Sequence, residues 1–214
     1  MRKTMIMLFL SVAAALLNFT LSYVSALLNL PIFLDTILTI SVTLVGGPVW
    51  GAFTGALTNL IGHTLRFWGW EGYLFALCNI ATAFITYFFM RLFPRDLEPR
   101  YDHAAQTQSR RYASIIERIV VLMLLSFTLC IGMSILGGLI AVLIRGINLA
   151  HVGEPGLSPN ANFNMFPRGF PVILEEILIR IPMNIIDRLI AAFGGYGIAL
   201  VLCKSPRQRS NLPA

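Results

Sequence analysis

The sequence predicts an all-α integral membrane protein with six transmembrane helices, and three observations support this fold class. Of its 214 residues, 57% are hydrophobic and only 12% are charged, whereas a soluble domain carries about 25% charged residues. Several apolar runs approach or exceed the roughly 20 residues that cross the hydrocarbon core of a bilayer. The basic residues cluster in a few segments between these runs. We therefore expect a single membrane domain over residues 1–214.

The apolar runs, and the turn-forming residues between them, divide the chain into spans. Three runs are long and nearly free of charge. The stretch 33–93 must hold an odd number of crossings if the charged segments are to lie on one side of the membrane. Glycine and proline at 46–48 and glycine at 69–72 divide that stretch into three. The predicted spans are 5–28, 33–46, 49–66, 72–90, 119–144 and 182–203.

The distribution of Lys and Arg predicts the orientation of these spans, because cytoplasmic loops accumulate basic residues. Both termini and the linker 94–118 are predicted to be cytoplasmic, and 146–181 is predicted to form an outer loop and an interfacial helix. The net charge of +6 reflects this orientation signal, so no nucleic-acid partner is predicted. Eleven of the 16 basic residues follow the pattern: Arg2, Lys3, Arg91, Arg95, Arg100, Arg110, Arg111, Arg118, Lys204, Arg207 and Arg209.

The third predicted span combines small residues at one end with polar residues at the other. Gly51 and Gly55 form a GxxxG motif, a spacing that lets two helix backbones approach closely. Asn59, His63 and Arg66 follow at i, i+4 and i+7, which places them on one face of a helix. Such a stripe should face the protein interior or water. It is typical either of a ligand pocket or of a rim that meets lipid headgroups.

Further polar residues near the outer ends of the spans are candidates for the same site. Asp35 either caps the second span or contacts a ligand. Asp187 either binds a donor group of a ligand or forms a structural ion pair with Arg145 or Arg188, because charges at this depth are usually paired or functional. Aromatic residues would stack a ring, and Arg66 or Arg145 would pair an anionic group. The predicted substrate-binding residues are Asn29, Asp35, His63, Arg66, Trp68, Asn79, Arg145, Asn184 and Asp187.

The sequence carries no enzymatic motif. It lacks HExxH, GxSxG, a phosphate loop and paired Cys-x-x-Cys motifs. Glu175 and Glu176 are adjacent, so on a helix they would point about 100° apart and form a poor acid–base pair. Cys78, Cys130 and Cys203 lie in separate spans without a paired spacing and are interpreted as small apolar residues. We therefore expect a non-enzymatic protein without a metal site.

Three motifs at the six-span spacing resemble the substrate-binding membrane subunit (S component) of energy-coupling factor transporters. They are Pro-x-x-x-Asp-Thr at 31–36, Gly-Pro-x-x-Gly-x-x-x-Gly at 47–55 followed by Thr58-Asn59, and Pro-x-Asn-x-x-Asp at 182–187. The resemblance covers most of residues 1–203. It implies a multi-pass protein of the bacterial cytoplasmic membrane that captures a vitamin or a similar micronutrient.

The resemblance also implies partners: a transmembrane scaffold subunit and two cytoplasmic ATPases. The ATP would be used by these partners, so this chain itself needs no cofactor. Members of the family often carry Ala-x-x-x-Ala motifs in the first span for contact with the scaffold subunit. Here the corresponding pair is Ser11 and Ala15, whose small side chains still permit close helix contact. This pair is the predicted docking site.

Two alternative functions remain open at this point. The first is a membrane sensor or assembly module that binds a ligand without transporting it. The eleven residues after Cys203 contain no signalling domain, which favours the transporter. The second is a solitary secondary carrier, for which ion-coupling residues near the midplane are expected, and few candidates for that role are present.

Overall fold

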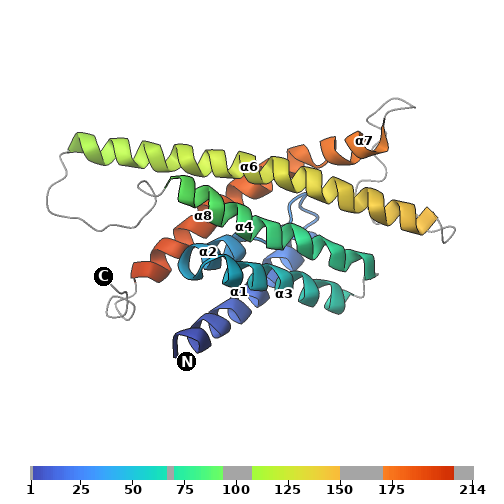
Figure 1. Ribbon diagram of the computed structural model, residues 1–214, viewed down its shortest axis with the longest axis horizontal. Helices are drawn as coiled ribbons and strands as arrows, with labels where there is room; N and C mark the ends of the chain where they lie inside the picture. Colours follow the sequence, from blue (N-terminus) through green and yellow to red (C-terminus); the bar gives the residue numbers. More distant parts are fainter. Residues whose placement is uncertain (1, 67–69, 94–107, 150–170, 205–214) are drawn as a thin grey trace.

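The computed structural model describes residues 2–66, 70–93, 108–149 and 171–204, and within them every regular element is helical (Figure 1). Four segments of this part of the chain are long and apolar enough to cross a membrane: Arg2–Leu27, Gly72–Leu92, Ile115–Ile144 and Val172–Cys203. The elements are α1 (Arg2–Leu27), α2 (Ile37–Gly46), α3 (Pro48–Arg66), the 3-10 helix η1 (Trp70–Phe75), α4 (Ala76–Leu92), α6 (Gln108–Leu149), α7 (Val172–Leu178) and α8 (Ile181–Lys204).

The helices follow the predicted order, and their lengths differ from the predicted spans. Helix α2 ends at Gly46 and α3 begins at Pro48. Gly47 between them has φ 91°, a conformation that glycine adopts readily. Helix α6 extends beyond the predicted span 119–144 in both directions. The apolar run marks only the part of a helix that can lie in the bilayer, and the helix itself can continue into the polar residues on either side. Helix α2 has only ten residues, too few to cross the hydrocarbon core alone.

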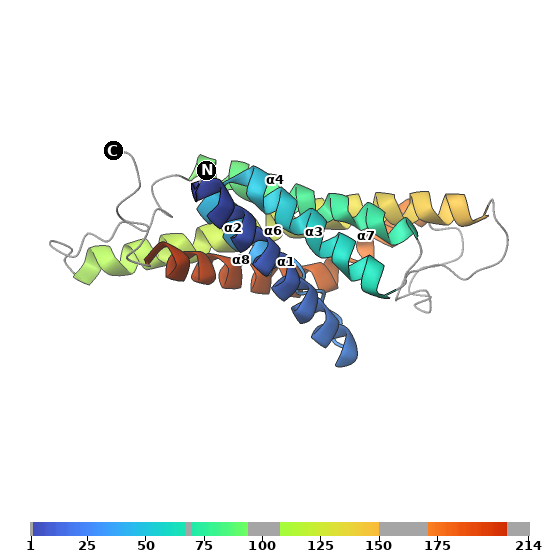
Figure 2. The ribbon, with the colours of Figure 1, turned by 90° about the horizontal axis from the view of Figure 1, so that it is seen from below.

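Successive helices run in opposite directions, so the helix bundle has two distinct ends. The start of α1 and the end of α8 lie toward the same end of the molecule, and the end of α3 and the start of α4 lie toward the other (Figure 2). Helices α3 and α4 pack against each other, as do α2 and α8, and α6 lies against α4, α7 and α8. The short α2 therefore lies within the bundle and contacts α1, α3, α4 and α8.

Polar side chains face the inside of this bundle and apolar side chains face outward. On α1 the buried residues include Ser11, Asn18 and Ser25, which are spaced by seven residues, whereas Leu16 and Leu17 are about half exposed. An exposed apolar stripe also runs along α6. Lipid offers no hydrogen-bond partners, so a membrane helix turns its polar groups toward the protein. The burial pattern thus supports the membrane assignment independently of composition.

Asn18 joins three helices at the centre of the bundle. Its Nδ2 donates to Thr39 Oγ1 on α2 at 3.1 Å and to Thr58 Oγ1 on α3 at 3.4 Å. Its Oδ1 accepts a hydrogen bond from the backbone N–H of Leu38 at 3.0 Å. That N–H lies in the first turn of α2, where it has no partner within the helix. One amide side chain therefore fixes the start of α2 against α1 and α3.

The GxxxG motif brings α3 close to two neighbouring helices. A Cβ atom at Gly51 would overlap the side chain of Thr43 on α2. A Cβ atom at Gly55 would lie 2.9 Å from the backbone oxygen of Asn79 on α4. The glycines thus set the separation between α3 and α4, and with it the position of Asn79.

Replacing Gly55 by Ala should destabilise the protein, because the added methyl group meets backbone atoms of α4 that cannot rotate away. We expect a loss of about 1–3 kcal/mol, as for other overpacked interiors, measured as a lower unfolding temperature in detergent. Gly197→Ala is the matched control, since no atom lies within 4 Å of a Cβ built there. Equal unfolding temperatures for the two variants would contradict the packing role of Gly55.

Candidate functional site

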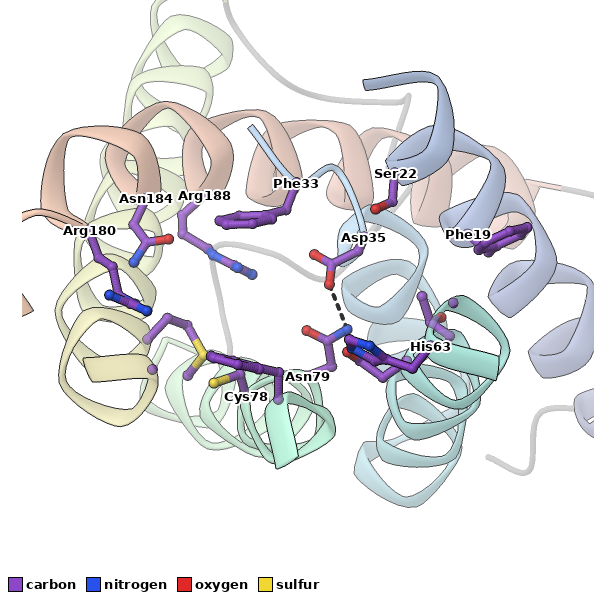
Figure 3. A pocket seen from close by; sticks show the side chains of 16 residues that line it. Phe19, Ser22, Phe33, Asp35, His63, Cys78, Asn79, Arg180, Asn184 and Arg188 are labelled. Carbon is purple, nitrogen blue, oxygen red and sulfur yellow. Dashed lines mark hydrogen bonds between the residues drawn. The ribbon is translucent and has the colours of Figure 1, made fainter. Parts of the chain in front are cut away.

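A cavity of about 200 Å³ lies toward the end of the bundle where α1 and α3 end and α4 and α8 begin (Figure 3). Its walls come from α1, the linker 28–36, α3, α4, α6 and the start of α8, so segments far apart in the sequence surround it. Charged, amide, aromatic and small side chains are all present on its walls. The lining residues are Phe19, Ser22, Phe33, Asp35, Thr58, Asn59, Gly62, His63, Phe75, Cys78, Asn79, Met133, Gly137, Arg180, Asn184 and Arg188.

Asp35 lines the cavity from the linker between α1 and α2. Its Oδ2 accepts a hydrogen bond from Asn79 Nδ2 at 2.9 Å, and its Oδ1 is buried without a hydrogen-bond partner. The helix cap considered for this residue does not form, because Thr36 is the N-cap of α2 and no side-chain capping bond is present. The carboxylate therefore keeps one oxygen available at the cavity.

Asp187 on α8 holds the linker in place from behind the cavity wall. Its Oδ1 accepts hydrogen bonds from the backbone N–H groups of Phe33 at 3.0 Å and Leu34 at 2.8 Å. Leu34 has φ 53°, an uncommon conformation for a branched residue, and the two hydrogen bonds stabilise it. Asp187 itself is fully buried and is absent from the cavity lining.

Arg188 completes this contact and also reaches the cavity. Its Nη2 lies 3.2 Å from Asp187 Oδ2, and its Nη1 donates to Thr36 Oγ1 at 2.7 Å. Its Nε is buried without a hydrogen-bond partner. The structural ion pair between Asp187 and Arg188 that was considered as an alternative is thus present. The guanidinium group both neutralises Asp187 and contributes a donor to the cavity wall.

A second arginine lies on the same wall. Arg180 Nη1 lies 2.7 Å from Glu176 Oε2 and donates to the backbone oxygen of Glu176 at 2.9 Å. Asn184, in the first turn of α8, donates through Nδ2 to Ser134 Oγ on α6 at 2.9 Å. In Figure 3, Arg180 and Asn184 lie on one side of the cavity and Asp35 lies across from them.

The remaining walls are apolar and aromatic. Phe33 extends over the cavity from the linker, and Phe75 and Phe19 contribute from η1 and α1. His63 is 9% exposed, and its ring meets that of Tyr73 edge-on with centroids 5.6 Å apart. A Cβ atom at Gly72 would overlap the His63 ring, so this glycine leaves room for it. An apolar enclosure with a few polar groups is typical of small-molecule sites.

Four of the predicted site residues line this cavity: Asp35, His63, Asn79 and Asn184. Asn29 is exposed at the end of α1 with φ 52° and is not among the lining residues. The side chains of Arg66 and Arg145 lie outside the described part of the structure, as does the whole of Trp68. The docking candidates Ser11 and Ala15 are both fully buried inside this chain, so neither is presented at its surface.

The sequence analysis did not predict the phenylalanines or the two arginines of the cavity as site residues, and it named Arg188 only as a possible partner of Asp187. Phe19, Phe33 and Phe75 gave no signal because phenylalanine is common throughout an apolar chain. Arg180 and Arg188 carried a usable signal, since a charged residue in or beside a membrane span is costly and is usually functional or paired. Among the described residues, no group of three or more His, Cys, Asp or Glu could hold a metal ion.

Comparison with protein-family models, with curated proteins and with solved structures finds no match for this chain. Its class therefore rests on its own features. The apolar helices and the inward-facing polar residues of the described part of the chain indicate an all-helical, multi-pass membrane protein, and the structure contains an internal cavity.

Removing the carboxylate of Asp187 should destabilise the linker and α8 together. Asp187→Ala leaves Arg188 buried without its counter-charge, and breaking a buried pair in this way costs about 3–5 kcal/mol. Asp187→Asn keeps an acceptor for the two linker N–H groups and should lose less. Thermal unfolding in detergent measures both effects.

Glu117→Ala is the control for this pair of variants, because Glu117 is an exposed acid on α6. Its unfolding temperature should stay close to that of the native chain. If Asp187→Ala unfolded at the same temperature as Glu117→Ala, the contact between Asp187 and the linker would not be structural.

Proposed function

We propose that the chain is the substrate-capture subunit of an ATP-driven importer of the energy-coupling factor type, and that its substrate is a vitamin or a related small molecule. One observation carries the proposal. Parts of all three stretches that resemble this family are distant in sequence and meet at the cavity: the segments 31–36 and 182–187, and the Thr58-Asn59 pair that follows the glycine motif at 47–55. The segment 31–36 contributes Phe33 and Asp35, Thr58-Asn59 lies on α3, and the segment 182–187 contributes Asn184.

The proposal includes six spans with both termini in the cytoplasm of a bacterium. The four long apolar helices are supplemented by α3, whose 19 residues suffice for a crossing, and by the short α2. The clustering of basic residues at 2–3, 91–118 and 204–209 supports this orientation. The cavity would then open toward the outer side, where a substrate is captured.

The size and lining of the cavity support a role in capture and release of a small molecule. Its charged groups are held before a ligand enters: Asp35 is hydrogen-bonded to Asn79 on α4, and each arginine is paired with a carboxylate close to it in sequence. A cavity of about 150 Å³ is known to hold benzene, so the 200 Å³ found here matches a single ring with short substituents. The scaffold and ATPase subunits would supply the energy for transport.

Two measurements test this function directly. Tagged protein expressed in a bacterium should co-purify with a scaffold subunit and two ATPases, and mass spectrometry should detect a small molecule that it retains. Co-purification fails to occur if the chain acts as a sensor or as a solitary carrier. The absence of these partners would refute the importer, whether or not a compound is retained.

Filling the cavity should abolish capture without unfolding the protein. Gly62 lines the cavity, and a Cβ atom there would make only an ordinary contact with Phe19 at 3.7 Å. We expect Gly62→Phe to lose at least about tenfold in affinity, a change of about 1.4 kcal/mol, because the ring occupies the ligand's space. Uptake of the retained compound into cells with the energising subunits is the readout.

Gly197→Phe is the matched control, because Gly197 lies on α8 with open space around it and is not among the lining residues. It should import the compound at the native rate. Native uptake by Gly62→Phe, or equal loss in both variants, would show that the cavity is not the capture site.

A further inference from the structure

The charges around the cavity are unequally compensated. Arg180 is paired with Glu176 and Arg188 with Asp187, so each cation on the cavity wall already has an anion. No ion pair to Asp35 is found among the described residues, and its partner is the neutral amide of Asn79. The two arginines and their two carboxylate partners together carry no net charge, so the carboxylate of Asp35 lacks a counter-ion among these residues.

The free atom of this carboxylate is placed for a ligand. Asp35 Oδ1 is buried, lacks a hydrogen-bond partner and belongs to a residue that lines the cavity. A buried acceptor without a donor is costly, and a charged one is more so. Figure 3 shows the carboxylate beside the cavity, across from the guanidinium group of Arg188. A positively charged nitrogen in the cavity would supply both the hydrogen bond and the missing charge.

We propose that the cavity binds a small cation: a one-ring molecule whose protonated or N–H-bearing nitrogen pairs with Asp35 Oδ1 while its ring lies among Phe19, Phe33 and Phe75. The inference deepens the proposed capture function, because it names the chemical class of the captured substrate. Arg188 Nε, the second buried atom without a partner on this wall, favours a hydrogen-bond acceptor elsewhere on the same molecule.

Other ligand classes fit these walls less well. An apolar ligand leaves Asp35 Oδ1 and Arg188 Nε buried and unpaired, which costs free energy for each atom. An anion finds two arginines that are already neutralised and meets the repulsion of Asp35. Face-on contact with aromatic rings further stabilises a cation.

Three probes of nearly equal size separate these classes: benzylamine, benzyl alcohol and benzoate. Binding to the purified full chain in lipid nanodiscs is measured by ligand-observed NMR. Hydrogen bonds to charged groups are worth more than neutral ones, so we expect benzylamine to bind at least about tenfold more tightly than benzyl alcohol. Benzoate should bind most weakly.

Asp35→Asn is the decisive variant. It keeps the size and the contact with Asn79 but removes the charge, so benzylamine should lose its advantage while benzyl alcohol binds as before. Glu117→Gln removes an exposed carboxylate on α6 and should change neither probe. Equal weakening of all three probes by Asp35→Asn would show a structural role and overturn the proposal.

The order of the probes on the native chain decides the question even if Asp35→Asn does not fold. Benzoate or benzyl alcohol binding as tightly as benzylamine would overturn the inference. The capture function would still stand if the energising subunits co-purified and the retained compound proved neutral or anionic. Selective benzylamine binding without those subunits would instead refute the importer and leave the cation site intact.

Discussion

Lipid cannot satisfy hydrogen bonds, and this constraint determines how the protein is organised. Each polar side chain within the spanning helices must find a partner inside the protein or in water. Asn18 meets this need by joining α1, α2 and α3, and Asn184 meets it through Ser134 on α6. These contacts fix the rotation of each helix, because turning a helix would expose the polar group to lipid. For the same reason, the side chains that α1 and α6 expose on the outside of the bundle are mostly apolar.

The charged groups that retain a buried atom without a hydrogen bond are concentrated in one place. Among the described residues these are Asp35, Asp187 and Arg188, all at or directly behind the cavity. Asp187 and Arg188 form an ion pair, so their remaining atoms are compensated by charge. Asp35 has no such partner in the described structure. The fold thus places its incompletely hydrogen-bonded charged groups beside the cavity, an arrangement that is common at binding sites.

In the proposed site, Asp187 has a structural role and Asp35 a role in ligand recognition. Asp187 binds the backbone of the linker and holds Phe33 over the cavity, although it never reaches the cavity itself. Asp35 lies on the linker that Asp187 holds. The position of the Asp35 carboxylate therefore depends on a contact between residues more than 150 positions apart in sequence. Loss of Asp187 would therefore change the position of Asp35, although Asp187 itself would not contact the ligand.

Sequence reasoning located much of this arrangement and failed at identifiable points. The break at 46–48, the close packing of Gly51 and Gly55 and the buried positions of Asn59 and His63 follow from local chemistry and helical period. The role of Asp187 could not be read in this way, because its partners lie on a linker that only the tertiary fold brings near. The phenylalanines of the cavity carry no distinguishing signal in an apolar chain. Whether a phenylalanine faces the cavity depends on the rotation of its helix, and that rotation is set by polar contacts elsewhere on the helix.

The central claim is that the unpaired carboxylate of Asp35 faces a ligand and not another protein group. The most direct test is a cryo-electron microscopy map of the chain with its retained compound, in a nanodisc and bound to an antibody fragment for size. We predict compact density in the cavity, with a donor group within hydrogen-bond distance of Asp35 Oδ1. A collapsed cavity in which Asp35 pairs directly with Arg188, or a cavity filled by a lipid chain, would contradict this account.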